Sequence, residues 1–466
     1  MNSHQTIGSS AGNLTAQLLS GDDFGSSSAS LGDLNGDGVL DIVVGAEGDD
    51  NERGAIYVLF LNEDGTCISH QKINGTMVGL NPGYEYYSRS GYYNFGRAVD
   101  NVGGDLNGDE VIDVIVGAFQ DNNEYYETGS VYVLFLNQKG LFTSYQKITK
   151  YTGNFTAELR YHDYFGTSVS NAGGDLNGDS ILDVMVGASG HYESYYGEVG
   201  TAYILFLDTG GTCISHQRIG RNAGGFTADL QIDEFLGRSC GSIGDLNRDG
   251  ILDVAVGATG HDLGSRYNVG VVYVLFLNMN GTCLSHQQIS YTQGGLTADL
   301  QYNEYFGRSV AHVASLGNGF SLLGNDHTQT DSGLSILLVG AYGHDTKTGA
   351  LYILYLDVHG ICESHRKISS DTGEFTGSLE EHGHFGTSVT SMDGDLNKDG
   401  MLDYVVTRSG KVYIIFAFAV DTFNLSSVEG CEQQVGQDGT GECATSGGDL
   451  ITLRGQFAPT RVVPWP

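Results

Sequence analysis

Aspartate and asparagine side chains recur in one short pattern whose spacing suits a bound metal ion. The first copy is DLNGDGVLD, and its residues at positions 1, 3, 5 and 9 are Asp33, Asn35, Asp37 and Asp41. Alternate side chains of such a loop can converge on one point, while the glycine at position 6 permits the sharp bend. Oxygen ligands at this density suit Ca²⁺, and the main-chain carbonyl at position 7 would add one more oxygen.

The same nine-residue pattern occurs five times. Each copy predicts one Ca²⁺ site, with side-chain ligands at positions 1, 3, 5 and 9 and a carbonyl ligand at position 7. The predicted ligands are Asp33, Asn35, Asp37, Val39 and Asp41; Asp105, Asn107, Asp109, Val111 and Asp113; Asp175, Asn177, Asp179, Ile181 and Asp183; Asp245, Asn247, Asp249, Ile251 and Asp253; and Asp395, Asn397, Asp399, Met401 and Asp403. Glu110 and Ser180 replace the glycine in the second and third copies, so the pattern is weaker there.

Neither a plain turn nor an EF-hand accounts for these five loops as well as a calcium site between strands. A lone D-x-N-x-D-G is often only a turn rich in Asp and Asn, but five copies at equivalent places favour calcium. An EF-hand loop needs an acidic residue at position 12 and a flanking helix. Here a strand-like run such as IVVGA follows at once, which indicates a hairpin loop between two strands.

The sequence offers no convincing catalytic group. Residues 237–241, GRSCG, satisfy the G-x-S-x-G pattern of hydrolases, which requires a strand before the serine and a helix after it. Sister segments GTSVS and GRSVA occupy the equivalent place in other repeats, so we interpret the match as coincidence. The fourteen histidines include no H-E-x-x-H motif. We therefore expect a protein that is not an enzyme.

The charge balance restricts the partners. Asp and Glu number 56 against 22 Lys and Arg, for a formal net charge of −34. Nucleic acids and anionic membranes attract basic patches, so neither is an expected partner, whereas cations are. The longest uncharged apolar run, 412–420, is nine residues, against roughly 20 for a spanning helix, so we expect no membrane insertion by this chain. Residues 1–30 show no signal-peptide pattern.

The acidic loops belong to a longer repeat that must position them. A Phe-Gly pair, Leu-Gly in the fourth copy, begins each unit, and successive pairs are 70 to 79 residues apart. Each unit continues through a short apolar stretch, the acidic loop, IVVGA, a polar loop, AIYVLFL and GTCISHQKI. These runs are short, β-branched or alternating, and Gly, Asn or Asp separates them, which predicts about four strands per unit and an all-β fold. Such units are typical of the blades of a β-propeller.

The units define the expected domain organisation. We predict a propeller over residues 1–420, with units near 24–73, 95–148, 165–219, 236–289, 306–368 and 385–417. Residues 3–7, SHQTI, match the last strand of a unit and are expected to pair with residues 411–416, closing a six-bladed ring with no open sheet edge. An incomplete seven-bladed ring is the alternative. The fifth unit has an insertion where the acidic loop should be, so no ion is expected there.

The repeat resembles the FG-GAP repeat of the integrin alpha-chain N-terminal β-propeller, because it combines Phe-Gly, D-x-N-x-D-G-x-x-D and V-V-G-A at these spacings. The resemblance covers roughly residues 4–417, with six units in place of seven and no Pro after the GA pair. It implies a calcium-binding, extracellular or cell-surface module for adhesion and ligand recognition. Residues 421–466 form a tail in which GGDLITLRGQF, residues 447–457, resembles the opening strand of a TIG domain, here truncated.

The cysteines and sequons fit a secreted glycoprotein. Four cysteines mark the repeated phrase GTCISH and not a disulfide ladder, and these are Cys67, Cys213, Cys283 and Cys362. Cys431 and Cys443 bracket a short loop and could pair, while Cys240 is left over. Five N-x-[ST] sequons are present, at Asn13, Asn74, Asn154, Asn280 and Asn424. Together with the resemblance, these features favour an extracellular or cell-surface location.

Tyrosines gather in the loops expected on the face opposite the acidic loops. They lie in the second-to-third-strand loops and in the connections between blades, at 84–93, 125–126 and 192–196. Tyrosine is common at recognition surfaces, so Tyr86, Tyr126 and Tyr195 are candidate contacts for a protein or glycan ligand. The alternatives are that the tyrosines only pack the long loops together, and that the propeller is a structural surface protein or spacer without a specific ligand.

Overall fold

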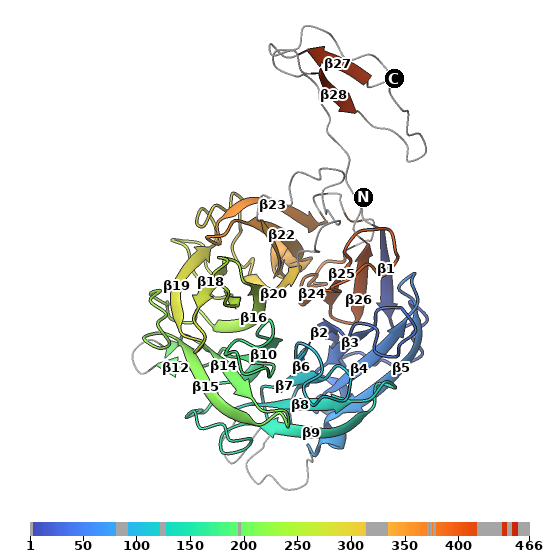
Figure 1. Cartoon of the computed structure of the whole chain (residues 1–466), viewed down its shortest axis with the longest axis vertical. Coiled ribbons are helices and arrows are strands. Elements are labelled where there is room, and N and C mark those ends of the chain that lie inside the picture. The colour runs from blue at the N-terminus through green and yellow to red at the C-terminus, as the bar shows by residue number, and fades with distance from the viewer. Residues whose placement is uncertain are drawn as a thin grey trace.

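Six four-stranded antiparallel sheets are arranged in a ring in the part of the chain that is described (Figure 1). The computed structural model describes residues 3–80, 92–121, 127–193, 197–313, 334–370, 372, 375 and 379–416, and the strand backbones at 440–444 and 450–454. The first three sheets are β2 (Phe24–Ser30), β3 (Ile42–Ala46), β4 (Ala55–Leu61) and β5 (Cys67–Asn74); β6 (Phe95–Asn101), β7 (Val114–Ala118), β8 (Ser130–Leu136) and β9 (Phe142–Ile148); and β10 (Phe165–Asn171), β11 (Val184–Ala188), β14 (Thr201–Leu207) and β15 (Cys213–Gly220).

The next two sheets repeat this order, and the last one completes the ring. They are β16 (Leu236–Gly244), β17 (Asp253–Ala258), β18 (Val271–Leu277) and β19 (Cys283–Ile289); and β20 (Phe306–Val313), β21 (Ser335–Ala341), β22 (Ala350–Leu356) and β23 (Cys362–Ser369). The sixth contains β24 (Val389–Ser391), β25 (Tyr404–Arg408), β26 (Lys411–Phe416) and, from the other end of the propeller sequence, β1 (Ser3–Gly8). In each blade the first strand lies nearest the centre (Figure 1).

The ring is closed by pairing between its first and last strands. β1 runs antiparallel to β26, with Ser3 opposite Phe416 and Gly8 opposite Lys411. The innermost strand of the sixth blade, β24, contacts both β2 and β20, so the sixth blade touches the first and the fifth. The predicted all-β, six-bladed propeller is confirmed, and the alternative of an incomplete seven-bladed ring is wrong.

Burial on both faces explains why the middle strands are apolar throughout. Every residue of β4, AIYVLFL, is buried, and so is every residue of β3, IVVGA. Each blade stacks face to face on its neighbours, so its middle strands have no solvent side and carry no polar alternation. The fourth strands lie at the rim and are only partly buried, as in β5, where Ile68 is 57% exposed and Ile73 fully buried.

The Phe-Gly and Gly-Ala pairs of the repeat meet between neighbouring blades. The backbone of Gly96 has φ +87°, a left-handed conformation that favours glycine. A Cβ atom on Gly45, in the preceding blade, would lie 2.0 Å from the carbonyl oxygen of Gly96, so only glycine fits there. That carbonyl also accepts a hydrogen bond of 3.0 Å from the hydroxyl of Ser27. The repeated motif is therefore a contact between blades.

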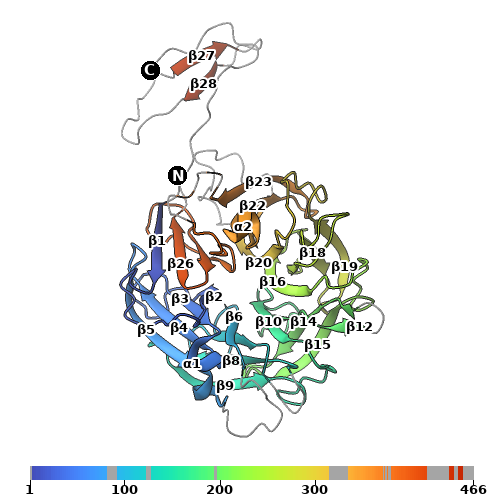
Figure 2. The same ribbon diagram turned by 180° about the vertical axis from the view of Figure 1, so that it is seen from behind.

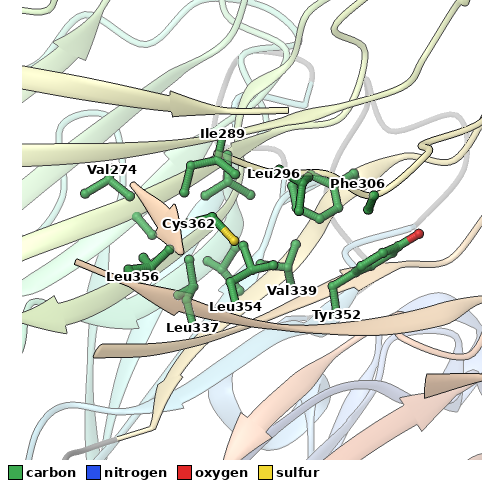
Figure 3. Packing of buried hydrophobic residues seen from close by; sticks show 14 of the residues in the cluster. Val274, Ile289, Leu296, Phe306, Leu337, Val339, Tyr352, Leu354, Leu356 and Cys362 are labelled. Carbon is green, nitrogen blue, oxygen red and sulfur yellow. The ribbon is translucent and has the colours of Figure 1, made fainter. Parts of the chain in front are cut away.

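The hydrophobic core is divided into clusters that lie between adjacent blades. Figure 3 shows the cluster between the fourth and fifth blades, in which Val274 and Ile289 meet Leu337 and Leu354. The thiol-bearing Cys362 lies within this apolar group. The cysteines at equivalent places, Cys67, Cys213 and Cys283, are likewise buried and free, and so is Cys240. In the described part of the chain, the repeated cysteines serve packing, as expected for markers of the repeat.

Several short elements are not part of the six four-stranded sheets. One-turn helical segments α1 (Asp49–Glu52) and α2 (His344–Lys347), both labelled in Figure 2, and the 3₁₀ turn η1 (Gly75–Val78) lie outside the sheets. β12 (Tyr192–Glu193) pairs with β13 (Gly197–Glu198), and β27 (Thr440–Ala444) pairs with β28 (Leu450–Arg454). None of the described helices is long and apolar enough to cross a membrane. The predicted boundary at residue 420 and the TIG-like nature of 421–466 stay predictions, and Cys431 lies outside the described residues.

Candidate metal loops and the channel

The five acidic loops all connect the first and second strands of their blades. They follow β2, β6, β10, β16 and β24 and precede β3, β7, β11, β17 and β25. First strands run in the same direction in every blade of an up-and-down propeller, so these loops share one face of the ring. This face is called the loop face below. The second-to-third-strand loops and the blade connections share the opposite face.

Within the first loop, the polar side chains accept hydrogen bonds from the loop's own backbone. The Asp33 carboxylate accepts from the N–H groups of Gly36, Asp37 and Gly38 at 2.8, 2.9 and 2.7 Å. The Asn35 amide donates to Asp37 at 3.0 Å, and the other oxygen of Asp37 accepts from the N–H of Val39 at 2.9 Å. These contacts fold the chain into a compact, exposed turn.

The other four loops repeat this geometry, including the two without glycine at position 6. The N–H at position 6 donates to the position 1 carboxylate in every copy, at 2.6 to 2.9 Å. Glu110 and Ser180 adopt φ +67° and +70°, in the same left-handed region as Gly38. A side chain costs about 1 kcal/mol or more in that region, so these two loops have the common shape at a cost in stability.

The aspartate at position 9 is buried in all five loops, and in the first, second and fourth it anchors the loop to its blade. Asp41 is fully buried, and its carboxylate accepts hydrogen bonds from the N–H of Leu34 at 3.2 Å and of Leu61, at the end of β4, at 3.1 Å. Burial raises the pKa of Asp41 to about 7, and the nearby charges of Asp37 and Asp33 add to the rise. Asp113 and Asp253 make the corresponding two contacts. This anchoring role is additional to the ligand role predicted from spacing.

Among the described residues, no group of three or more His, Cys, Asp or Glu side chains is placed to hold a metal ion. The carboxylates at positions 1 and 9 are turned toward backbone N–H groups, as in Asp33 and Asp41. The donor set itself fits Ca²⁺, since each loop offers only oxygen atoms and gathers three carboxylates within one turn. The place of the fifth loop, between Val313 and Leu334, lies outside the described residues, so the absence of an ion there stays a prediction.

The three tyrosines chosen as ligand contacts, Tyr86, Tyr126 and Tyr195, lie outside the described residues. Of the neighbouring candidates, Tyr93 is buried in the core, while Tyr92 and Tyr192 are exposed. The structure adds Tyr267 and Tyr302, which are 55% and 57% exposed and stack edge to face with ring centroids 6.0 Å apart. They come from a second-to-third-strand loop and a blade connection, where the same tyrosine enrichment could have indicated them.

Buried acid–tyrosine–histidine groups support the face opposite the loops, and sequence reasoning missed them. Glu304 is fully buried and accepts from the hydroxyl of Tyr352 at 2.8 Å, with Nδ1 of His344 at 2.7 Å. Glu234 holds Tyr273 and His261 in the same way in the preceding blade. The signal was available, because a tyrosine recurs at the third position of every AIYVLFL-like strand. These groups fix the long loops of that face to the blades.

The match to G-x-S-x-G has a structural role. Ser239 lies inside β16, and its hydroxyl donates at 2.8 Å to the carbonyl of Gly307 in the next blade. The next element is the loop 245–253 and then another strand, β17, so the strand–turn–helix arrangement of a nucleophile elbow is not present at this position.

The first strands of the blades surround a central channel. Its cavity has a volume of about 390 Å³ and is lined by residues of β2, β6, β10, β16, β20 and β24 and of the segments flanking them. The lining is mixed: it has many serines and threonines, three arginines and two aspartates, Asp100 and Asp393, together with apolar side chains that include several valines. No spacing rule in the sequence indicated these residues, because they come together only when the ring closes.

The sequence of the chain is similar to known repeat proteins. The FG-GAP repeat model matches residues 24–59, 165–205 and 241–275. Integrin alpha-11 from Homo sapiens is 32% identical over 213 residues, which cover 45% of this chain and 15% of that protein. This chain carries FG-GAP repeats and resembles the integrin alpha chains. The three matched FG-GAP segments include the first and third acidic loops, 33–41 and 175–183, and the fourth, 245–253.

Two further relatives match this chain over longer segments. Integrin alpha-5 and integrin alpha-4, both from Xenopus laevis, are 29% and 28% identical over 259 and 304 residues. These segments cover 55% and 64% of this FG-GAP chain and 20% and 24% of the relatives. The chain thus spans less than a quarter of the length of these proteins. A solved structure titled "Structure of Dos1 propeller" matches with a TM-score of 0.32 and 9% identity, over 84% of this chain and 66% of that one.

Proposed function

We propose that this FG-GAP propeller is an extracellular or cell-surface module that binds a protein or glycan ligand in adhesion or recognition and is stabilised by Ca²⁺. The observation that carries the proposal is the fivefold repetition of one acidic, oxygen-lined loop on one face of an integrin-alpha-like ring. The resemblance to integrin alpha chains supports adhesion over the alternative of a structural spacer. Catalysis has no support from a nucleophile elbow or from a catalytic zinc motif such as H-E-x-x-H in the sequence.

Calcium would act in this protein as a structural ion. In each loop the side chains at positions 1, 3, 5 and 9 and the carbonyl at position 7 would hold it, as in Asp33, Asn35, Asp37, Val39 and Asp41. The bound ion would supply positive charge to a turn that carries three carboxylates and no basic residue of its own in the first copy. Binding only to the folded loop would stabilise the ring.

The ligand would bind the face opposite the loop face. That face carries the longer and more varied loops, and its described tyrosines include the exposed pair Tyr267 and Tyr302. Large, rigid tyrosine rings favour recognition because little side-chain entropy is lost on binding. The five acidic loops, in contrast, are short turns whose side chains are committed to their own backbone.

A binding screen tests the proposal directly. The chain is immobilised and probed with extracellular-matrix proteins and a glycan array, in calcium and in EDTA. The triple variant Tyr86→Ala, Tyr126→Ala, Tyr195→Ala is expected to lose any binding found, with a nearly unchanged melting temperature.

A matched control substitutes three exposed side chains on the fourth strands, Ile68→Ala, Ile214→Ala and Leu284→Ala, which are 55 to 64% exposed at the rim. This control should bind normally. If the chain binds no probe, the alternative of a structural spacer is favoured. If only loop-face variants lose binding, the ligand binds the loop face and not the opposite one. Turnover of any substrate would contradict the proposal.

A further inference from the structure

One end of the central channel is surrounded by six equivalent positions that the repeat does not keep constant. Each lies directly after the Phe-Gly or Leu-Gly pair that begins a first strand. In chain order they are Ser26, Arg97, Thr167, Arg238, Arg308 and Thr387, and all six line the channel. Because the acidic loops follow the other end of the same strands, this ring of residues lies toward the face opposite the loop face. It is called the arginine ring below.

The positive charge of the arginine ring is only partly balanced. Arg97 forms an ion pair with Glu47 at 2.7 Å, and its Nε is buried without a hydrogen-bond partner. Within the described residues, the guanidinium groups of Arg238 and Arg308 make no ion pair and no hydrogen bond. Burial and the neighbouring arginine charges lower the pKa of Arg238 to about 10 and that of Arg308 well below its usual range.

Aromatic rings hold two of the arginines without neutralising them. The guanidinium of Arg97 lies 5.7 Å from the ring centroid of Phe119, and that of Arg308 lies 5.5 Å from the ring centroid of Tyr342. A planar guanidinium stacked in this way keeps its N–H groups available at the edge. The hydroxyls of Ser26, Thr167 and Thr387 already donate to main-chain carbonyls at 2.7 to 3.0 Å. Since Arg97 is paired with Glu47, the guanidinium groups of Arg238 and Arg308 are the free donors of the ring.

The other end of the channel has the opposite character. Asp100 and Asp393 line it, and Asp100 accepts from the N–H groups of Asn101 and Asn171 at 2.9 and 3.1 Å. His312, also in the lining, lies near Gly244 at that end. In a chain of net charge −34, three arginines around one opening are a local concentration of positive charge. The polarity of the channel would place an anion at the arginine ring and exclude it from the far end.

We propose that the arginine ring is a binding site for a tetrahedral oxyanion of the sulfate or phosphate class. Guanidinium forks match such oxyanions, since each presents parallel N–H donors at the spacing of two anionic oxygens. The anion is either a free ion or a sulfate or phosphate group carried by a larger ligand. This inference goes beyond the proposed function and does not depend on calcium binding.

Substitutions taken from the chain's own repeat test the site. The variant Arg238→Thr, Arg308→Thr replaces two arginines with the residue that the third and sixth blades use at the same position, and it leaves the Arg97–Glu47 ion pair intact. The control Arg266→Thr removes a half-buried arginine that pairs with Asp299 at 2.8 Å outside the channel. Sodium sulfate is the probe, because phosphate precipitates calcium, and sodium chloride holds the ionic strength constant.

The expected result is one sulfate bound per chain by calorimetry in the native protein and in the control. The double variant should bind about a hundredfold more weakly, or about tenfold for each charged donor lost. Without sulfate, the double variant should melt at a higher temperature than the native chain, because repulsion among the arginines is relieved. A purely structural role for the arginines predicts a lower melting temperature. Equal sulfate affinity in the double variant and the native protein would overturn the proposal.

The same assay distinguishes a free anion from a sulfate group carried by a larger ligand. N-acetylglucosamine 6-sulfate is compared with unsulfated N-acetylglucosamine. Tighter binding of the sulfated sugar than of inorganic sulfate supports a group carried by a larger ligand, while tighter binding of inorganic sulfate supports a free ion. Absence of binding by both sulfate and the sulfated sugar would refute the site.

Discussion

The two ends of the innermost strands differ in how strictly they follow the repeat. At the loop face, the five acidic loops keep the same residue types at positions 1, 3, 5 and 9 and the same hydrogen bonds. At the arginine ring, the equivalent position alternates among serine, threonine and arginine. Each loop's side chains bond to that loop's own backbone, so every copy needs them. The side chains at the ring position line the channel and make different contacts in different blades. Departures from an internal repeat can therefore indicate where a repeat protein has a specific activity.

Removing calcium should have the largest effect, and it tests whether the constancy of the loop face reflects ion binding. Extracellular calcium modules have Kd values on the order of 10⁻⁴–10⁻³ M. At a free concentration of about ten times Kd, each site contributes roughly 1.4 kcal/mol to the free energy of unfolding. Five sites would contribute about 7 kcal/mol, comparable with the whole stability of an ordinary domain. EDTA should lower the Tm by many degrees in a thermal melt, and Mg²⁺ should restore it poorly.

If EDTA leaves the melting curve unchanged, the five loops are hydrogen-bonded turns and their constancy is purely structural. Restoring excess Ca²⁺ after EDTA is the control, and it should return the original Tm.

Removing one ligand should cost about a fifth of that gain. Asp249→Ala, or Asp37→Ala in the first loop, is expected to reduce the calcium-dependent part of the unfolding free energy by about 1.4 kcal/mol, since one of five sites is lost. Denaturant melts with and without calcium give this part by difference. Asn325→Ala, in the insertion of the fifth unit, is the matched control and should leave it unchanged. An equal loss in that control would show that the loops are not the ion sites.

Restoring glycine at position 6 should stabilise the second and third loops slightly. Glu110→Gly and Ser180→Gly each remove a side chain from a left-handed conformation and should add about 1 kcal/mol to the unfolding free energy. Gly38→Ala in the first loop is the reverse control and should lose a similar amount. No atom lies within 4 Å of the added Cβ, so the loss would come from backbone strain alone. Unfolding free energies from urea melts are the measurement, and a destabilised Glu110→Gly variant would contradict this account.

The smallest expected effect is at the far end of the channel. Burial lowers the pKa of His312 from 6.5 to about 4. Between these values the unfolded chain takes up a proton that the folded chain does not, so stability is lost as pH falls from 6.5 toward 4. At pH 6 this loss amounts to about 0.8 kcal/mol. His312→Gln should therefore be less destabilised than the native chain between pH 8 and pH 6 in urea melts.

The effect of His312 is the difference in unfolding free energy between His312→Gln and the native chain at each pH. Burial raises the pKa of Asp100 to about 7 and also raises that of Asp393, so these groups act with the opposite sign in both. Identical pH profiles for the two proteins would contradict the assigned state of His312.

The sequence was sufficient for features that each repeat encodes locally. The strands, the six blades and the acidic loops follow from short apolar runs and from Gly, Asn and Asp at fixed offsets. The anchoring of Asp41 by the N–H of Leu61 was not predictable, because spacing within one loop says nothing about the next strand. The arginine ring required closure of the whole ring, since Arg97 and Arg308 are 211 positions apart in the chain.

Ring closure by β1 and β26 also has a consequence for biosynthesis. Ser3 leaves the ribosome well before its partner Phe416, which follows 413 residues later. At roughly 5–20 residues per second, the first strand waits roughly 20–80 s for its neighbour. Five complete blades can form during this interval, while one β-strand stays without its sheet and one face of the first blade stays uncovered. Chaperones that shield an exposed strand during translation are thus expected to matter more for this chain than its final stability suggests.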